Sequence, residues 1–223
     1  MGEIVKLTAA DGHHLNAYKA GPANAAHGLV VIQEIFGCNI HIRNMVDRFA
    51  AAGYLAIAPA LFDRAGPGIE LGYTADDVVV GRDARMKLTD AMVRHDVEAA
   101  AAALGHKVLG IVGYCFGGTV AWNMACRSKL FAAASGWYGG GIAATRTETP
   151  HCPVQLHFGE LDHSIPQSDV ELIRAAQPGV EVHVYKGAQH GFGCDERASY
   201  DAASYALAQS RTLEFFAKNL ARD

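Results

Sequence analysis

A short turn, Gly113-Tyr-Cys-Phe-Gly-Gly118, contains the residue types that covalent chemistry needs. The apolar run 108–112 before the turn predicts a buried strand, and residues 119–125 after it have the composition of a packed helix. Glycines beside the central residue let the chain reverse sharply, which leaves the side chain between them on a strained, accessible turn. That central residue is Cys115, so the turn predicts a thiol nucleophile for acyl transfer.

Two residues that could activate this thiol follow in the sequence. Asp162 comes just after a predicted strand at 154–158, and His190 comes just after another at 182–185. Because the carboxyl ends of parallel strands meet at one edge of a sheet, we expect both side chains to lie near Cys115. The order nucleophile, acid, histidine is the order of α/β-hydrolases, so the three residues together predict a Cys-His-Asp catalytic triad.

Each of these features also has a simpler interpretation. Cys115 alone could be a small buried hydrophobe, Asp162 could cap the helix that follows it, and His190 is one of 11 histidines. A phosphate-binding loop would need a lysine after the glycines of this turn, and the glycine pattern of a dinucleotide site is absent from the chain. The ordered combination therefore favours the nucleophile turn.

The composition is that of a soluble globular protein. The 223 residues are 50% hydrophobic and 19% charged, which fits a single domain spanning residues 1–223. The formal net charge of -4 gives no support for nucleic acid or an anionic membrane as a partner. No apolar stretch reaches the ~18 residues that a membrane-spanning helix needs, and the first residues do not have the pattern of a signal peptide.

The cysteines and histidines of the chain indicate the redox state of its compartment and whether it could bind a metal. Five cysteines without a Cys-x-x-Cys pair favour a reduced, cytoplasmic setting. A zinc site is not expected, because the alternation of a strand would point the clustered candidate ligands to different faces. Those candidates are His151, Cys152, His157 and His163. The proposed chemistry needs no metal or organic cofactor, and we expect none.

The elements that must position these residues alternate between strands and helices. Residues 3–8 and 15–19 flank the turn signal Asp11-Gly12 and predict an N-terminal β-hairpin. Further strands are expected at 28–33, 54–58, 108–112, 131–138, 154–158 and 182–185, and helices at 42–52, within 76–104, and at 119–125, 167–176 and 200–220. This order predicts an α/β protein with the α/β-hydrolase fold, in which a mostly parallel sheet is flanked by helices and preceded by the hairpin.

Two segments carry more specific expectations. Residues 59–75 are rich in Gly and Pro and predict a long loop that overhangs the site. The last helix has a predicted apolar face that would pack against the sheet. That face consists of Ala206, Leu213, Phe216, Ala217 and Leu220.

The chain resembles the dienelactone hydrolase family (carboxymethylenebutenolidases), small α/β-hydrolases that use Cys in place of Ser. The resemblance runs through nearly the whole chain and is carried by four motifs. These are Gln33-Glu-Ile-Phe-Gly-Cys-Asn39, the turn 113–118, Asp162 in a Gly-x-x-Asp-x-x-x-Pro setting, and Gly187-Ala-Gln-His-Gly-Phe192. It implies that Cys115 is the nucleophile, His190 the base and Asp162 the acid that orients this base.

The resemblance also implies roles for residues outside the triad. Glu34 corresponds to a family Glu that contacts the resting thiol and helps to activate it. The backbone N–H groups of Ile35 and Phe116 would form the oxyanion hole. Arg82 corresponds to an Arg that binds the substrate carboxylate, and Phe36 is expected to line the substrate site.

One position departs from the family pattern. Characterised lactonases of the family carry a second carboxylate-binding Arg four residues after the catalytic His, where this chain has Cys194. Arg197 stands three positions further on, and the sequence leaves open whether it substitutes for the missing Arg. The natural substrate is therefore left open.

The predicted activity is hydrolysis of activated carboxylic esters or enol lactones through a thioester acyl-enzyme. A thiolate leaves a tetrahedral intermediate more readily than an ordinary alkoxide, so a less basic leaving group such as an enolate is favoured. Alternatives are a redox-sensing or binding protein on the same scaffold, a thioesterase, and a glutamine amidotransferase, whose acid would stand at Phe192. The expected partner is a small-molecule ester or lactone, and the expected state is a monomer or small homo-oligomer.

Overall fold

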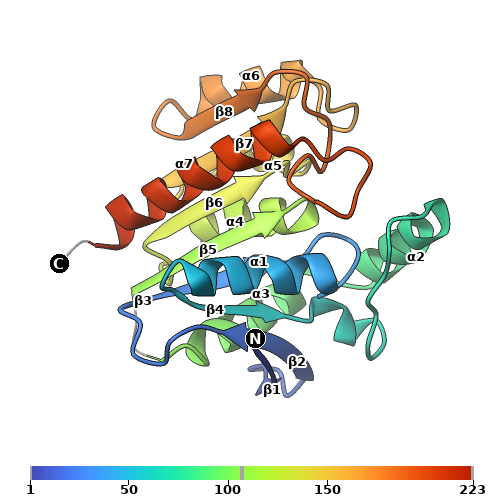
Figure 1. The fold of residues 1–223 in the computed structure, drawn as a ribbon, viewed down its shortest axis with the longest axis vertical. Coiled ribbons are helices and arrows are strands. Elements are labelled where there is room, and N and C mark those ends of the chain that lie inside the picture. Colours follow the sequence, from blue (N-terminus) through green and yellow to red (C-terminus); the bar gives the residue numbers. More distant parts are fainter. Residues whose placement is uncertain (1, 106–107, 222–223) are drawn as a thin grey trace. The chain divides into compact units, whose positions relative to one another are not determined.

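The computed structural model describes residues 2–105 and 108–221, and the chain divides into two compact units. The first unit comprises residues 1–109 and the second residues 110–223. Each unit contains its own strands and helices (Figure 1). The single domain that the composition predicts for 1–223 stays a prediction.

The first unit begins with a hairpin and continues with alternating strands and helices. Its elements are β1 (Glu3–Thr8), β2 (His14–Ala20), β3 (His27–Ile32), α1 (Ile40–Ala51), β4 (Leu55–Pro59), the 3-10 helix η1 (Leu61–Arg64), α2 (Ala75–Met86) and α3 (Asp90–Ala102). Their strands lie in the order β1-β2-β4-β3. The β1–β2 and β2–β4 pairs are antiparallel and the β3–β4 pair is parallel, so the N-terminal hairpin is confirmed.

Strand β3 leads into the Gln33–Asn39 motif. Its residues from Leu29 to Ile32 are fully buried, which explains why this strand reads as a continuous apolar run. Figure 1 shows α1 in front of the strands of this unit and α3 behind them, and both helices pack on β3 and β4. Asn39 then begins α1 as its N-cap, with the side-chain oxygen accepting a hydrogen bond from Ile42 N.

The sequence predicts a long loop at residues 59–75, and this expectation is partly wrong. The segment contains η1, whose Arg64 binds the buried carboxylate of Asp96 at 2.7 Å and Asp11 at 2.8 Å. The segment ends at Thr74, which forms a capping box with Asp77 at the start of α2. A buried ion pair with a residue 32 positions away fixes this stretch, and Gly and Pro content alone does not predict such a contact.

The second unit is a run of parallel strands connected by helices. Its elements are β5 (Val108–Tyr114), α4 (Phe116–Arg127), β6 (Ala133–Trp137), α5 (Ile142–Thr145), β7 (Val154–Gly159), α6 (Gln167–Ala176), β8 (Glu181–Tyr185) and α7 (Ala202–Leu220). The strands lie in the order β5-β6-β7-β8, and each neighbouring pair is parallel. The carboxyl ends of β5, β7 and β8 therefore lie at one edge of these strands, and Cys115, Asp162 and His190 follow them within a few residues.

The buried face of α7 matches the predicted one only in part, with Phe216 and Leu220 fully buried as expected. Helix α7 packs against β6 and β7 (Figure 1), but Ala206 and Ala217 are exposed. Thr212 is fully buried instead, because its hydroxyl accepts a hydrogen bond from the indole of Trp137 at 3.2 Å and lies 3.1 Å from Nε2 of His157. The buried face of α7 therefore includes a polar residue, which apolar periodicity does not predict.

The helices in the described part of the chain fall short of what a bilayer crossing requires in length and apolar character.

Candidate active site

Cys115 occupies the sharp turn between β5 and α4. Its backbone has φ 54 and ψ -115, a conformation that L-residues rarely adopt and that marks a strained position. A Cβ on Gly113 would overlap the Gly117 carbonyl oxygen, and one on Gly118 would lie 2.5 Å from the Trp137 carbonyl oxygen. Only glycine fits at these two positions, as the motif predicts.

Asp162 and His190 meet at the carboxyl ends of β7 and β8. Oδ2 of Asp162 lies 2.7 Å from Nδ1 of His190, and the Asp162 side chain is fully buried. The second carboxylate oxygen, Oδ1, accepts a hydrogen bond from Ser164 N at 2.8 Å. The carboxylate is thus held in one orientation, and it fixes the imidazole with Nε2 turned away from the acid.

His190 also forms a hydrogen bond with the Cys115 side chain. Burial by itself lowers the pKa of His190, but the hydrogen bonds to Asp162 and Cys115 and the negative charges of both outweigh it and raise the pKa to about 10. A histidine held beside a thiol can take up its proton, which is the arrangement found around cysteine nucleophiles. The structure thus brings together the three residues of the predicted triad within the second unit.

Aromatic side chains support the His190 loop from within the core. The Tyr138 ring meets the His190 ring edge-on at 5.2 Å between centroids, and Phe192 packs on Tyr138 at 5.5 Å and on Trp137 at 5.7 Å. Tyr138 has φ 39, so it is a second strained residue, and its N–H donates to the His157 carbonyl at 2.7 Å. Sequence reasoning missed Tyr138. The signal for it was its place between a strand and the run Gly139-Gly140-Gly141.

The region after His190 contains the position that departs from the family. Cys194 is fully buried. The guanidinium of Arg197 packs over Gly191, where a Cβ would lie 2.5 Å from Nη1. Arg197 therefore lies against the residue that follows His190, although its role toward substrate stays open.

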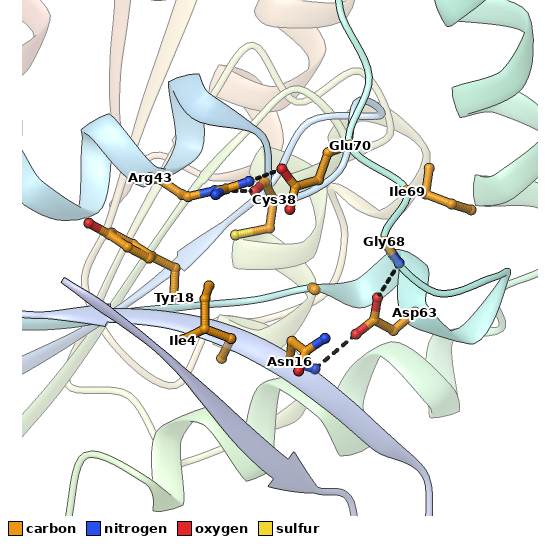
Figure 2. Close-up of a pocket in the computed structure, with 11 residues that line it drawn as sticks. Ile4, Asn16, Tyr18, Cys38, Arg43, Asp63, Gly68, Ile69 and Glu70 are labelled. Atoms are coloured by element: carbon orange, nitrogen blue, oxygen red, sulfur yellow. Dashed lines mark hydrogen bonds and ion pairs between the residues drawn. The ribbon is translucent and has the colours of Figure 1, made fainter.

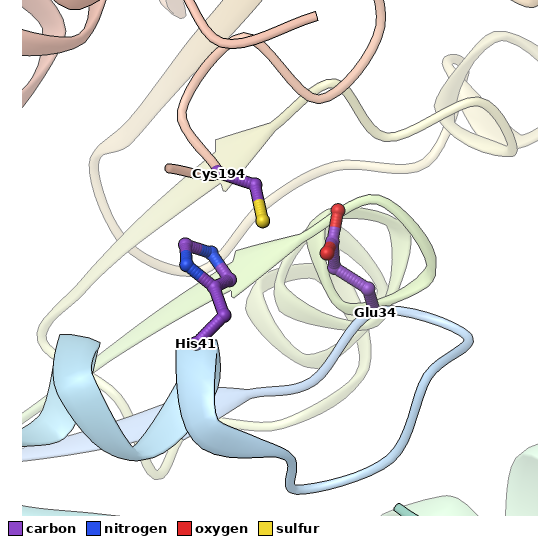
Figure 3. A group of neighbouring side chains, drawn as sticks. All are labelled: Glu34, His41 and Cys194. Carbon is purple, nitrogen blue, oxygen red and sulfur yellow. The ribbon is translucent and has the colours of Figure 1, made fainter. Parts of the chain in front are cut away.

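Four predicted site residues belong to the first unit. Glu34, Ile35 and Phe36 follow β3, and both Glu34 and Phe36 are almost completely buried. A carboxylate oxygen of Glu34 and a ring nitrogen of His41 lie within 4.8 Å of one another (Figure 3). His41 is buried in the first turn of α1 and was missed by sequence reasoning, since its position in the helix gives no chemical signal. The proposed roles of Glu34, Ile35 and Phe36 stay predictions.

Arg82 lies on α2 and is exposed. Its neighbour Gly81 is buried, and a Cβ there would overlap the carbonyl oxygen of Ile35. The helix that carries Arg82 therefore packs closely on the Gln33–Asn39 motif. Whether Arg82 binds a carboxylate stays a prediction.

The first unit also contains a cavity of about 160 Å³ between β2, the start of α1 and residues 60–70 (Figure 2). Arg43 forms an ion pair with Glu70 at its edge and donates from Nε to the Cys38 carbonyl at 3.0 Å. Asp63 accepts hydrogen bonds from the backbone N–H groups of Asn16 and Gly68. The predicted site residues do not line this cavity.

Three of the other cysteines are poor nucleophiles. All five cysteines are free, but burial raises the pKa of the Cys38 and Cys126 thiols to about 12 and that of Cys152 to about 11. These three thiols are therefore neutral at physiological pH.

The dienelactone hydrolase family model matches residues 15–220. The chain belongs to the dienelactone hydrolase family. It is 37% identical over 212 residues to a "Putative carboxymethylenebutenolidase" of Synechocystis, with 86% of each sequence covered. It is 33% identical over 230 residues to the carboxymethylenebutenolidase of Pseudomonas putida, with 96% of each covered. Membership makes the chain an enzyme that hydrolyses carboxylic esters or lactones.

A solved structure extends this likeness to the fold. The crystal structure named "Putative Dienelactone Hydrolase" from Klebsiella pneumoniae superimposes with a TM-score of 0.81 at 33% identity, covering 97% of this chain and 99% of that one. The predicted fold class is therefore confirmed: this family member has the α/β-hydrolase fold.

Proposed function

We propose that this hydrolase cleaves activated carboxylic esters or enol lactones through a thioester formed on Cys115. The observation that carries the proposal is the buried Asp162–His190 pair, 2.7 Å apart, hydrogen-bonded onward to a cysteine on a strained turn. A structural cysteine does not need a strained backbone and an oriented imidazole, whereas a nucleophile does.

The first half of the reaction acylates the thiol. The Cys115 thiolate attacks the ester carbonyl carbon, and the carbonyl electron pair moves onto oxygen to give a tetrahedral oxyanion. Phe116 is the first residue of α4. The first N–H groups of a helix have no carbonyl partner within the helix, so they are available to bind a negative charge. We infer that the Phe116 N–H donates to this oxyanion, together with the N–H of Ile35 that the family resemblance suggests.

The intermediate then collapses in one of two directions. The C–S bond breaks again if the ester oxygen is a strong base, and the substrate is released unchanged. If the oxygen belongs to an enolate or a phenolate, the C–O bond breaks, and the His190 imidazolium supplies the proton to the leaving group. Activated esters and enol lactones are therefore the favoured substrates.

The second half of the reaction frees the enzyme. His190, now neutral, takes a proton from water, and the resulting hydroxide attacks the thioester carbonyl. The C–S bond breaks, the acid is released and Cys115 returns as thiolate beside the imidazolium. These steps use only side chains and backbone groups of the chain, so they call for no metal or organic cofactor.

Residues of the first unit complete the proposal. We propose that Glu34 helps to activate the thiol, that Phe36 lines the acyl or alkyl part of the substrate, and that Arg82 attracts a substrate carboxylate. The family resemblance supports these roles. A cytoplasmic location is part of the same proposal and is supported by the five free cysteines.

The test is turnover of p-nitrophenyl acetate by Cys115→Ala and His190→Ala, with Cys152→Ala as the matched control. We expect each of the first two variants to lose kcat/KM by several orders of magnitude, because the triad acts as a unit. The control should keep its rate, since the Cys152 thiol is neutral. Full turnover by Cys115→Ala would overturn the assignment of the nucleophile.

A further inference from the structure

The helix α2 contacts the Gln33–Asn39 motif through a glycine. Gly81 is buried in the middle of α2, where glycine is an unfavourable residue for a helix. A Cβ on Gly81 would overlap the Ile35 carbonyl oxygen and would lie 3.1 Å from the Ile35 carbonyl carbon. The contact is made with backbone, which cannot swing aside as the end of a flexible side chain can. Gly81 therefore sets how closely α2 approaches the Ile35 backbone.

Residues 69–73 make a second set of contacts with the motif. Leu71 N donates to the Phe36 carbonyl at 2.8 Å, and the Tyr73 ring meets the Phe36 ring at 4.6 Å. Nδ2 of Asn39 donates to the Leu71 carbonyl at 3.0 Å and to the Tyr73 hydroxyl at 3.1 Å. Residues 69–73 thus contact the motif through a backbone hydrogen bond, an aromatic ring contact and the hydrogen bonds of the Asn39 amide.

This holding segment is itself anchored at its start. Figure 2 shows the Arg43–Glu70 ion pair and the hydrogen bond from Gly68 N to Asp63 at the edge of the cavity. A Cβ on Gly37 would overlap the Ile69 carbonyl oxygen, so the two stretches of backbone pass at the closest distance that glycine permits. The segment therefore resists displacement away from the motif.

We propose that Gly81 and Tyr73 are positioning residues that clamp the backbone of Glu34–Phe36 and thereby aim the N–H of Ile35 at the oxyanion. This inference rests on the proposed function, in which Ile35 is one of the two oxyanion donors. Neither residue touches the reacting atoms. Gly81 acts by leaving room for the Ile35 carbonyl, and Tyr73 acts by fixing Phe36 and Asn39.

Loosening the clamp should slow ester turnover in a way that a general loss of structure would not. An oxyanion donor must lie about 2.7–3.1 Å from the developing charge, so a small displacement of Ile35 weakens it steeply. Loss of one such donor costs about 10²- to 10³-fold in rate. Alkylation of Cys115 by iodoacetamide forms no oxyanion, because the thiolate displaces iodide at a tetrahedral carbon. Ester turnover and thiol alkylation should therefore respond differently to the same change.

The experiment compares Gly81→Ala and Tyr73→Phe with two matched controls. Gly179→Ala adds a methyl group at a glycine where nothing lies within 4 Å, and Tyr200→Phe removes a hydroxyl from a tyrosine on the surface. The substrate is p-nitrophenyl acetate, which is neutral and so does not report on Arg82. For each variant, kcat/KM, the rate of Cys115 alkylation and the melting temperature are measured.

We expect Gly81→Ala to lower kcat/KM at least tenfold while Cys115 alkylation keeps the wild-type rate. Tyr73→Phe removes the neutral hydrogen bond from Asn39 and should lower kcat/KM about two- to tenfold, again without affecting alkylation. If Gly81→Ala does not fold, the kcat/KM and alkylation rate of Tyr73→Phe test the clamp. Unchanged kcat/KM in folded variants, or an equal fall in turnover and alkylation, would overturn the clamp. Failure of the proposed function is distinguishable, since Cys115→Ala would then retain turnover.

Discussion

Replacing Asp162 by Asn removes the charge that faces His190 and leaves the shape of the side chain nearly unchanged. In the structure Oδ2 lies 2.7 Å from His190 Nδ1, and Oδ1 accepts the Ser164 N–H at 2.8 Å. Both partners of the carboxylate are donors when it is ionised. An amide can accept at only one of these places, because its NH2 group must face the other donor. The Asp162→Asn variant would therefore lose one contact or force His190 into the opposite tautomer.

The size of the effect follows from this geometry. A hydrogen bond to a charged group is worth about 1.5–3 kcal/mol, which corresponds to about a ten- to 150-fold change in rate. A wrong tautomer adds to this, and the comparable change in a serine-protease triad costs ~10⁴-fold in kcat. We expect Asp162→Asn to lower kcat/KM by ~10²- to 10⁴-fold, which is less than the loss expected for Cys115→Ala.

The pH profile gives a second readout of the same change. Burial lowers the pKa of His190, and the hydrogen bonds and charges of Asp162 and Cys115 raise it to about 10. The protonated imidazole is therefore present below that pH and is lost as pH rises through it. Without the Asp162 charge the pKa of His190 falls, so the alkaline limb of kcat/KM should move toward neutral pH.

The assay is hydrolysis of p-nitrophenyl acetate across pH, with the rate of Cys115→Ala subtracted at each point. Glu171→Gln removes an exposed carboxylate from α6 and serves as the control for charge alone. A loss smaller than about tenfold, with the alkaline limb in its wild-type place, would refute the reasoning that links Asp162 to His190.

Four further predictions follow from the structure. Iodoacetamide should modify Cys115 first, as peptide mass mapping over time would show, because burial raises the pKa of three other thiols, Cys38, Cys126 and Cys152; faster modification of any of these would contradict it. Glu34→Gln should lower kcat/KM with little change in melting temperature, whereas lost stability with unchanged specific activity would indicate a structural role. Arg82→Ala should lower kcat/KM about ten- to 100-fold for anionic lactones and leave neutral aryl esters nearly unaffected, and an equal effect on both substrate types would show that Arg82 binds no carboxylate. Burial, followed by the neighbouring His183, lowers the pKa of His157 well below 6.5. The stabilisation from this histidine should therefore be complete above pH 6.5, and the free energy of unfolding should fall by up to about 1.4 kcal/mol per pH unit below it. Urea unfolding should show a smaller slope for His157→Gln than for the wild type, because the lowered pKa of His183 contributes to the slope in both; an equal slope in both would contradict the role of His157.

The sequence was most informative where short motifs determine local geometry. The turn around Cys115 was predictable because such a sharp turn requires glycine at positions such as Gly113 and Gly118, and the structure shows backbone approaches there that only glycine permits. The positions of Asp162 and His190 after strands were predictable because apolar runs end where the strands end. The hairpin followed from the Asp11-Gly12 turn signal in the same way.

Features set by contacts between distant residues could not be predicted. Tyr138 has a positive φ and packs against His190, and the buried Thr212 bonds with Trp137 and His157, contacts that no local pattern indicates. The close approach of Gly81 to Ile35 joins a helix to a loop that precedes it by 46 residues, and nothing in either segment alone indicates that they meet.

The central claim is that acyl groups are transferred to the Cys115 sulfur, and the most direct test is to observe that bond. Enzyme mixed with p-nitrophenyl acetate is quenched in acid after a few milliseconds, and its intact mass and peptide map are recorded by mass spectrometry. The account predicts a mass increase of one acetyl group on the peptide that carries Cys115, which is absent from Cys115→Ala and removed by hydroxylamine. Turnover without any acylated Cys115 peptide, or acetyl accumulating and decaying at turnover rate on another residue, would contradict it.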